Sequence, residues 1–290
     1  MNGFGDRLRA AFDEVGQLCV GIDPHGGLLQ AWGLPASAAG VREFGLRVVD
    51  ACRGRVGVVK PQVAFFERFG SAGFAALEEV QAAARAAGLL VIADAKRGDI
   101  GSTMDGYVAA WLEPGSPLEA DAVTVSPYLG PASLRATIAA AVRAGKGVFV
   151  LAATSNPEAV GLQSAEVTVV AAERGQTVAD WVADGVAWAN RVPADAGGLG
   201  PVGLVVGATV DRSEVGLSDG SLRGAPLLAP GFGAQGAGLR DIGTIFGRFA
   251  PQVVASASRS VLASGPDGIV TAIDSHNAEL ADALREENRG

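Results

Sequence analysis

The sequence alternates eight times between a short apolar run and a longer stretch with helical periodicity. Short apolar runs bounded by turn residues are typical of parallel strands that are buried on both faces. The predicted strands are residues 17–23, 56–60, 89–94, 122–125, 147–152, 202–207, 227–230 and 253–257. The predicted helices that follow them are residues 37–53, 71–87, 102–112, 133–144, 165–191, 211–217, 238–249 and 266–285. Eight consecutive β-then-α units predict an α/β fold, the (β/α)8 or TIM barrel, and the structural alternative is an open, doubly wound sheet.

Length and composition predict that residues 1–290 form a single barrel domain. A chain of 290 residues, of which 49% are hydrophobic, can bury a large core. No linker or low-complexity tract divides it, although the region 160–200 is longer than the predicted fold requires and has no role that the sequence assigns.

Charge and cysteine content limit the partners and the compartment. A net charge of −8 and a pI of about 4.9 argue against a nucleic-acid surface. They leave room for a small anion, because a few N–H groups and one arginine suffice to bind it. Cys19 and Cys52 lie in apolar surroundings and are predicted to be buried thiols. With no N-terminal signal pattern and no long apolar run, we expect no membrane partner and a cytoplasmic protein.

Charged residues follow the third predicted strand. Asp94 and Lys96 are two residues apart, so an extended backbone points both to the same face, and Asp99 follows Gly98, where the chain can turn. In such an array the lysine stays protonated because its neighbours are anionic, which suits a proton donor and not a Schiff-base nucleophile. The alternative interpretation is a structural salt-bridge cluster at the surface.

Polar residues also stand at the ends of other predicted strands. Asp23 can be a turn residue before Pro24, Lys60 can extend to solvent or pair with Asp94, and Ser155 can cap a helix or turn. In a barrel, however, the carboxyl ends of all strands meet at one mouth, where active sites are built. The residues that would gather there are Asp23, Lys60, Asp94, Lys96, Ser155, Gln235 and Arg259.

A glycine-rich segment after the seventh predicted strand suggests a phosphate site. Gly231 and Gly233 allow the backbone to approach oxygen atoms closely, and Arg259, after the next strand, suits bidentate contact with phosphate. Loops after the last two strands commonly bind phosphate in this architecture. The alternative is an ordinary connecting loop.

The strand-end motifs resemble those of the orotidine 5′-phosphate decarboxylase family. The signature Asp94-x-Lys96-x-x-Asp99-Ile100-Gly101-x-Thr103 is the most specific match. Further matches, in the family's order, are Gly21-Ile22-Asp23, Val59-Lys60-Pro61, Pro230-Gly231-x-Gly233-Ala234-Gln235-Gly236 and Ser258-Arg259-Ser260. The segments most similar to the longer bacterial (type 2) branch are Gly21-Ile22-Asp23-Pro24-His25, Lys60-Pro61-Gln62-x-Ala64-Phe65-Phe66-Glu67 and Thr154-Ser155-Asn156-Pro157.

The resemblance implies a TIM-barrel homodimer that converts orotidine 5′-monophosphate to UMP, the last step of de novo pyrimidine synthesis, without cofactor or metal. It implies that Lys96 donates a proton to C6 of the pyrimidine and that Lys60, Asp94 and Asp99 complete the charge array. Asp99 and Thr103 would reach into the neighbouring subunit's site, so that the active site is shared.

Contacts with the substrate follow from the same resemblance. Asp23 and Lys60 would hold ribose hydroxyls, and Ser155 would contact the pyrimidine amide. Gln235 and Arg259 would bind the phosphate, together with the backbone of Gly231 and Gly233. One departure affects this end of the site, because Ala257-Ser258 stands where the family more often has Val-Gly.

Two other functions remain open from the sequence. A sugar-phosphate keto-acid decarboxylase keeps the Asp-x-Lys-x-x-Asp array but needs Mg²⁺, and Glu67 is a candidate for its additional carboxylate. A non-catalytic protein that binds a nucleotide phosphate would not need the full array. A Schiff-base aldolase is disfavoured because acids flank Lys96.

Overall fold

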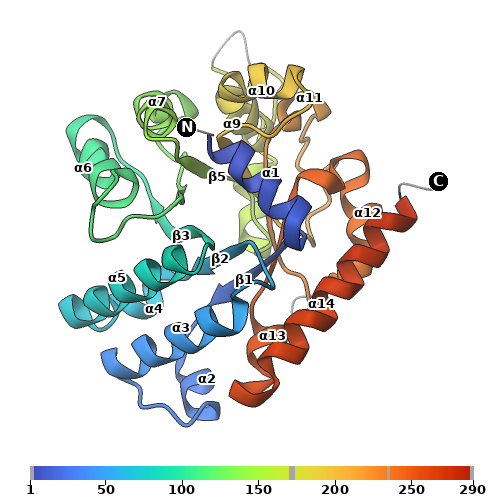
Figure 1. Ribbon diagram of the computed structural model, residues 1–290. Helices are drawn as coiled ribbons and strands as arrows, with labels where there is room; N and C mark the ends of the chain where they lie inside the picture. Colours follow the sequence, from blue (N-terminus) through green and yellow to red (C-terminus); the bar gives the residue numbers. More distant parts are fainter. Residues whose placement is uncertain (1–2, 170–173, 234–235, 288–290) are drawn as a thin grey trace.

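Eight parallel strands form a closed barrel in a computed structural model that describes residues 3–169, 174–233 and 236–287 (Figure 1). The strands pair in sequence order, and β8 pairs with β1. This closure confirms the (β/α)8 barrel and rules out the open sheet. The strands are β1 (Leu18–Ile22), β2 (Val58–Pro61), β3 (Leu90–Arg97), β4 (Ala122–Val125), β5 (Gly147–Ala153), β6 (Val202–Val206), β7 (Leu227–Pro230) and β8 (Val253–Ala257).

Helices connect the strands and surround the barrel (Figure 1). The α-helices are α1 (Phe4–Val15), α2 (Gly26–Ala31), α3 (Ala38–Cys52), α4 (Val63–Glu67), α5 (Gly70–Ala86), α6 (Gly101–Leu112), α7 (Arg135–Arg143), α8 (Val160–Gln163), α9 (Val178–Ala187), α10 (Arg191–Asp195), α11 (Asp219–Leu222), α12 (Ile242–Phe246), α13 (Arg259–Leu262) and α14 (Gly265–Glu287). Short 3₁₀ segments are η1 (Pro131–Leu134), η2 (Pro157–Ala159), η4 (Trp188–Asn190), η5 (Leu239–Asp241) and η6 (Gly247–Gln252).

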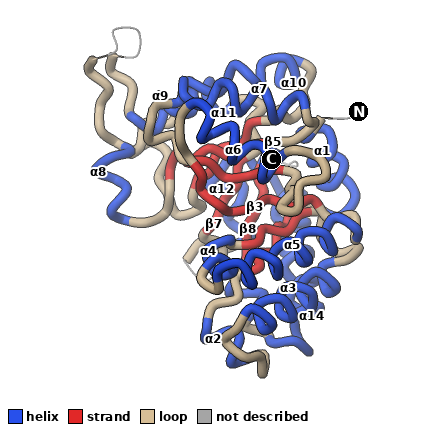
Figure 2. Tube along the Cα trace, turned by 90° about the vertical axis from the view of Figure 1, so that its left-hand side faces the viewer, coloured by secondary structure: helices blue, strands red, loops and turns tan. Residues whose placement is uncertain are grey.

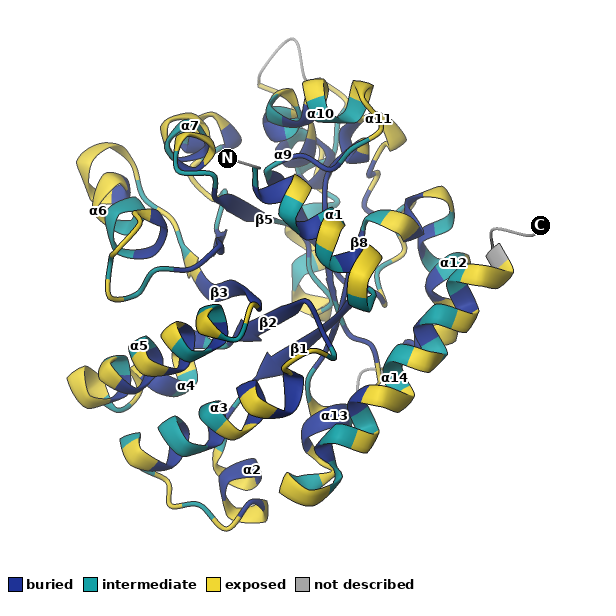
Figure 3. Cartoon of the chain, viewed as in Figure 1, coloured by how far each residue is buried: buried dark blue, intermediate teal, exposed yellow. Residues whose placement is uncertain are grey.

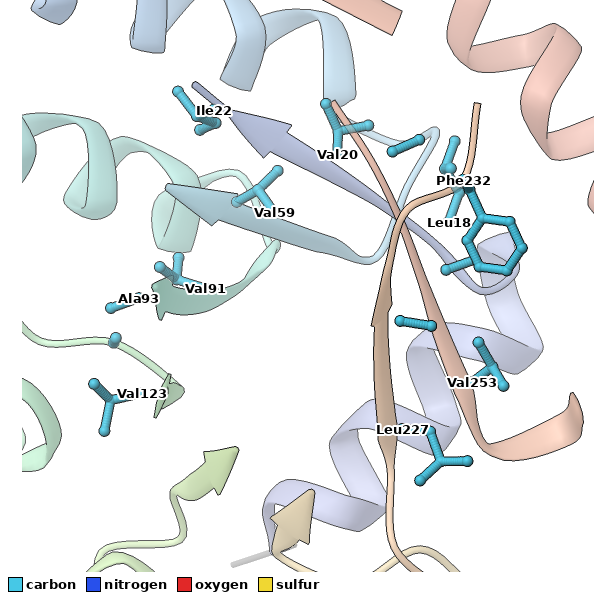
Figure 4. Close-up of a cluster of buried hydrophobic side chains, with 14 of the residues drawn as sticks. Leu18, Val20, Ile22, Val59, Val91, Ala93, Val123, Leu227, Phe232 and Val253 are labelled. Atoms are coloured by element: carbon cyan, nitrogen blue, oxygen red, sulfur yellow. The ribbon is translucent and has the colours of Figure 1, made fainter. Parts of the chain in front are cut away.

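The barrel core has two layers because successive strand residues point in opposite directions. Outward-facing residues such as Val20, Val59 and Val91 pack beneath the surrounding helices (Figure 4). The helices are buried on the side that faces the strands and exposed on the other (Figure 3). Inward-facing residues such as Ile92 and Phe149 form a separate cluster inside the barrel.

Helix α1, which the sequence analysis did not predict, covers the amino-terminal end of the barrel. Phe4 packs edge-to-face on Phe149, with ring centroids 5.9 Å apart. It also lies so close to Gly147, the first residue of β5, that a Cβ there would be 2.4 Å from its ring. Since this end is filled, the carboxyl ends of the strands are the end where a cavity can open.

The predicted helix over residues 165–191 is wrong in its first half. Residues on either side of the undescribed positions 170–173 pair as an antiparallel ladder, with an isolated bridge between Glu166 and Thr177. Gly175 has a φ of 92°, and the Thr177 hydroxyl accepts a hydrogen bond from the Asp180 N–H at 3.1 Å, which makes Thr177 the N-cap of α9. The segment that contains α8 projects from the barrel (Figure 2).

Other predicted helices also differ from the structure. Residues 211–217 form turns, because Asp211 binds the Ser213 N–H locally at 2.8 Å and Gly216 has a φ of 65°. The predicted helix 238–249 is divided into η5, α12 and the start of η6, and Gly247, with a φ of 52°, ends α12. The remaining predicted helices and all eight strands agree with the structure within a few residues.

Two further sequence expectations concern the cysteines and the membrane. Cys19 and Cys52 are free and buried, as predicted, and burial raises the pKa of each thiol to about 12. Within the described ranges, we find no helix with both the length and the apolar character needed to span a membrane.

Candidate active site

A cavity of about 430 Å³ opens at the carboxyl ends of the strands. This volume is in the range of sites for small molecules. Seven of the residues predicted from the sequence line it, namely Asp23, Lys60, Asp94, Lys96, Ser155, Gly231 and Arg259. They come from β2 and β3 and from the segments that follow β1, β5, β7 and β8.

Asp94 is the centre of the charged group in this cavity. Its Oδ2 lies 3.0 Å from Lys60 Nζ, and its Oδ1 lies 2.6 Å from Lys96 Nζ. The side chains of Asp94 and Lys60 are 10% and 7% exposed, whereas that of Lys96 is 46% exposed. Two buried groups therefore support a third that faces the cavity, which is not the arrangement of a surface salt-bridge cluster.

The ionisation of the buried pair follows from its surroundings. Burial alone would raise the pKa of Asp94, but the charges and hydrogen bonds of Lys60 and Lys96 lower it well below its usual range. Burial alone would lower the pKa of Lys60, but Asp94 and Asp23 raise it above its usual value. Both groups are therefore charged throughout the neutral range.

Lys96 has an unusual backbone that a bulge in β3 explains. Ala93 pairs with Val123 and Arg97 pairs with Val125, so residues 94–96 lie opposite Thr124 alone. The φ of Lys96 is 47°, and no other non-glycine residue of the described chain has a positive φ. The Thr124 hydroxyl accepts a hydrogen bond from the Lys96 N–H at 2.9 Å and donates one to Asp94 Oδ1 at 2.9 Å.

Thr124 is not among the site residues predicted from the sequence, which stand at the ends of strands or in the segments that follow them. Thr124 lies inside β4, between Val123 and Val125, and a threonine at such a position is typical of an ordinary β-strand. No signal in the sequence distinguished it from the other residues of the strand.

Two residues of the predicted signature, Asp99 and Thr103, lie outside the cavity of the single chain. Asp99 is in the loop after β3, where its Oδ1 accepts a hydrogen bond from the Ile100 N–H at 2.8 Å. Thr103 is exposed in the first turn of α6. Neither lines the cavity.

Near β1, the cavity contains an acceptor without a partner. Asp23 Oδ1 is buried and has no hydrogen-bond partner in the described chain. The Ser258 side chain lies beside it over Gly21, where an added Cβ would be 1.8 Å from Ser258 Oγ and 3.3 Å from Asp23 Oδ1. Gly21 thus makes room for the Ser258 side chain. A buried acceptor of this kind is suited to a hydroxyl donor supplied by a ligand.

The segments that follow β7 and β8 present backbone groups and one cation to the mouth. Gly231 and Gly233 have φ values of 112° and 76°, and Phe232 between them is 3% exposed and anchors the loop. Arg259, at the first position of α13, is exposed, and no described residue forms a hydrogen bond or ion pair with its guanidinium. Gly231 and Arg259 line the cavity, Gly233 does not, and the predicted contact Gln235 lies outside the described residues.

Three more cavity residues had no predicted role: His25, Gln62 and Phe65. His25 is the N-cap of α2, where its Nδ1 accepts a hydrogen bond from the Leu28 N–H at 3.4 Å. Its ring lies 6.1 Å from that of Phe65. These residues belong to segments that resemble the type 2 branch, but their residue types did not by themselves predict a role in the site.

The candidate metal ligand Glu67 is occupied elsewhere. Its Oε1 lies 3.1 Å from Arg97 Nη2, and Glu67 does not line the cavity. Among the described side chains, no group of three or more His, Cys, Asp or Glu residues is arranged to hold a metal ion.

Comparisons with known proteins agree with this geometry. The sequence profile of the orotidine 5′-phosphate decarboxylase / HUMPS family matches residues 16–272. An orotidine 5′-phosphate decarboxylase from Salinispora arenicola is 52% identical over 267 residues, which are 92% of each chain. One from Streptomyces coelicolor is 48% identical over 289 residues, 98% of this chain and 99% of its own.

Solved structures give the same result. The crystal structure of a Streptomyces avermitilis protein assigned as an orotidine 5′-phosphate decarboxylase superposes with a TM-score of 0.89 at 47% identity. The match covers 98% of this chain and 97% of that one. The Leishmania donovani OMP decarboxylase superposes with a TM-score of 0.71 at 29% identity, over 97% of this chain and 98% of its own.

Proposed function

Because the chain belongs to the orotidine 5′-phosphate decarboxylase / HUMPS family, we propose that it decarboxylates orotidine 5′-monophosphate to UMP in pyrimidine synthesis. The observation that carries this proposal is the group of Lys60, Asp94 and Lys96, which places a half-exposed ammonium on a buried ion pair inside the cavity. The protein is expected to act in the cytoplasm, as one domain over residues 1–290.

The proposed substrate orientation follows from the two ends of the cavity. The phosphate lies against Arg259 and the backbone of Gly231, because a guanidinium with no partner among the described residues suits an oxyanion and a glycine lets the backbone approach it closely. Gly233, whose N–H donates to the Ala237 carbonyl at 2.8 Å, is proposed to shape the loop that presents this surface. Gln235 is proposed as a further phosphate contact. This orientation puts the pyrimidine near the charge array at the other end.

The nucleoside is held between these ends. Asp23, with its unpaired buried oxygen, accepts from a ribose hydroxyl, and Lys60 donates to another. Ser155, which lines the cavity after β5, contacts the pyrimidine amide. These assignments make each of the three groups complementary to one part of the nucleotide.

The proposed reaction needs no covalent intermediate with the protein. The bond between C6 and the carboxylate breaks, its electron pair stays on C6, and CO₂ leaves. Protonated Lys96 stabilises the developing negative charge and then gives its proton to C6, so that UMP forms and Lys96 becomes neutral. Its 46% exposure allows water to restore the proton. Asp94 holds the Lys96 ammonium in place beforehand and lies near the leaving carboxylate.

We also propose a homodimer with shared active sites. Asp99 and Thr103 lie outside the cavity of their own chain, on the segment that follows β3. Large apolar side chains are exposed nearby on the connections after β3 and β4, since Ile100, Tyr128 and Leu129 are 61%, 80% and 52% exposed. An apolar surface beside residues that would enter a neighbour's site supports an interface there.

Mixing two inactive variants tests the sharing. In a hybrid of Lys96→Ala and Asp99→Ala subunits, one site carries both changes and the other carries none. Random exchange of equal amounts is therefore expected to restore about a quarter of wild-type activity. Activity that stays at the level of the separate variants, after subunit exchange has been demonstrated, would contradict the shared site.

The reaction itself is tested by following the ultraviolet absorbance of orotidine 5′-monophosphate in the presence of EDTA. Steady loss with UMP as the product is expected, with Lys96→Ala as the inactive control. Loss of activity in EDTA that Mg²⁺ restores would instead indicate the metal-dependent sugar-phosphate enzyme. A folded protein that binds UMP but leaves the substrate unchanged would indicate a binding protein.

A further inference from the structure

Thr124 of β4 connects the main chain of Lys96 to the side chain of Asp94. Its side chain is buried, with the residue 1% exposed, yet it borders the cavity. Its hydroxyl accepts from the Lys96 N–H and donates to Asp94 Oδ1, both at 2.9 Å. An N–H can only donate and a carboxylate can only accept, so the direction of both hydrogen bonds is fixed.

We propose that Thr124 is a positioning residue that locks the bulge of β3 and thereby fixes the Lys96 ammonium above Asp94 for catalysis. This inference rests on the proposed function, because it assigns a role in the same reaction. Thr124 itself has no contact with the reacting carbon in this proposal.

The bulge explains why such a residue is needed. Opposite Thr124, β3 supplies three residues, 94–96, where a regular ladder would supply one. The Lys96 N–H is thereby removed from the ladder and receives the threonine hydroxyl as its acceptor. Lys96 also adopts a φ of 47°, a conformation that a long side chain rarely takes without support from its surroundings.

The conformation brings Lys96 back to the face of Asp94. In consequence, the main chain of Lys96 and the Oδ1 atom that its ammonium contacts are bound to the same hydroxyl. Removing the hydroxyl releases both ends of this connection at once. A small displacement of a reacting group is enough to reduce a rate by about 10²-fold.

Thr124→Val keeps the shape of the side chain and removes the hydroxyl. We expect kcat to fall about 10²-fold, whereas the Kd for UMP changes less than about threefold, because binding depends on the other cavity groups. Thr124→Ser keeps the hydroxyl and is expected to recover kcat to within about threefold of wild type. Thr137→Val, at a buried threonine of α7 that does not line the cavity, is the matched control and should leave kcat unchanged.

The outcomes separate positioning from simple structural support. A Thr124→Val enzyme with kcat within about threefold of wild type would overturn the inference. The inference would also be overturned if Thr124→Val weakened UMP binding by as large a factor as it reduced kcat. It would be overturned as well if the kcat of Thr124→Ser were as low as that of Thr124→Val. If Thr124→Val does not fold, Thr124→Ser must still be at least tenfold faster than Thr124→Ala. Failure of the proposed function is distinct, because wild type itself would then be inactive.

Discussion

The two ends of the cavity hold charge in different ways. At the end formed by β2, β3 and β4, every charged group is bound to another group of the same chain, and Lys60 and Asp94 are buried. At the end formed by the segments after β7 and β8, the cation Arg259 is exposed and has no partner among the described residues. Gly231, which has a φ of 112°, lines the cavity together with Arg259.

This difference indicates a division of roles. The array is organised before any ligand arrives, so its contribution should be greatest in the transition state, where preorganised charge lowers the barrier. The phosphate end is completed only by the ligand's own charge, so its contribution should be greatest in binding. Substitutions at the two ends should therefore change different kinetic constants.

The largest effect is expected for Lys96→Ala. Loss of both the fixed positive charge and the proton donor should reduce kcat by at least about 10⁴-fold. The fold should be retained, because Lys96 is the most exposed member of the array. Arg223→Ala, which removes an exposed cation paired with Asp195, is the control and should keep full activity. A Lys96→Ala enzyme with nearly wild-type kcat would exclude the proton-donor role.

Asp94→Asn should reduce kcat by about 10³-fold and destabilise the fold. The change leaves the buried Lys60 ammonium without its anion, a defect that costs about 3–5 kcal/mol. Circular dichroism during urea unfolding measures the free energy of unfolding, and steady-state assays measure kcat. If kcat falls while KM for the nucleotide stays within a few-fold, Asp94 belongs to the preorganised end as argued.

The pH dependence of stability sharpens the same comparison. The pKa of Asp94 is depressed in the folded protein, so its stabilising effect is present above the unfolded value of about 3.9 and is lost as the pH falls toward the folded value. The pKa of Lys60 is raised, so its effect is lost only as the pH rises above about 10.4. The stability difference between wild type and the double variant Lys60→Met/Asp94→Asn, which removes both charges of the pair, should therefore be constant from about pH 5 to 9 and shrink below about pH 4. A steady change across pH 6–8 would contradict the assigned charges.

The residues at the two ends of the cavity could be predicted from the sequence to different degrees. The spacing of Asp94 and Lys96 predicted that both side chains lie on one face, and they do meet, but through a bulge with Lys96 at a φ of 47° and not through the extended backbone that the prediction assumed. The bulge and the hydroxyl of Thr124 could not be predicted, because an extra residue in a ladder leaves no mark in apolar periodicity. The predicted helix over 165–191 was wrong for a related reason, since Gly175 and the Thr177 cap interrupt an apolar pattern that continues on both sides. At the phosphate end, Gln235 remains a prediction from resemblance.

Arg259→Ala should act mainly on binding. Removing a charged hydrogen-bond donor costs about 1.5–3 kcal/mol, which corresponds to an increase in KM of about 10- to 10²-fold. Addition of free guanidinium ion should recover part of the activity. Arg240→Ala is the control, because Arg240 lies on η5, pairs with Glu279 and does not line the cavity. An Arg259→Ala enzyme with unchanged KM and reduced kcat would reverse the roles assigned to the two ends.

The smallest effect is expected for a substitution at Gly233, where the glycine-rich loop after β7 packs against Ser260 of α13. A Cβ on Gly233 would lie 2.7 Å from both Cβ and Oγ of Ser260. Ser260 cannot move aside freely, because its Oγ lies 3.0 Å from Nε2 of His276, while Nδ1 of that ring lies 2.8 Å from the Ala272 carbonyl. Because the carbonyl can only accept, Nδ1 is the donor to it, and in that tautomer Nε2 accepts a hydrogen bond from the Ser260 hydroxyl.

Gly233→Ala should therefore displace the loop and raise KM about tenfold, with kcat within a few-fold of wild type. The double variant Gly233→Ala/Ser260→Gly removes the clash and should recover most of the loss, leaving only the strain of an alanine at a φ of 76°. Gly236→Ala has a φ of 108° and no heavy atom within 4 Å of the added Cβ, so it measures backbone strain without a clash. If the double variant binds no better than Gly233→Ala, contact with Ser260 does not hold the loop. The phosphate end would then depend on the glycine backbone alone, in sharper contrast to the side chains of the array.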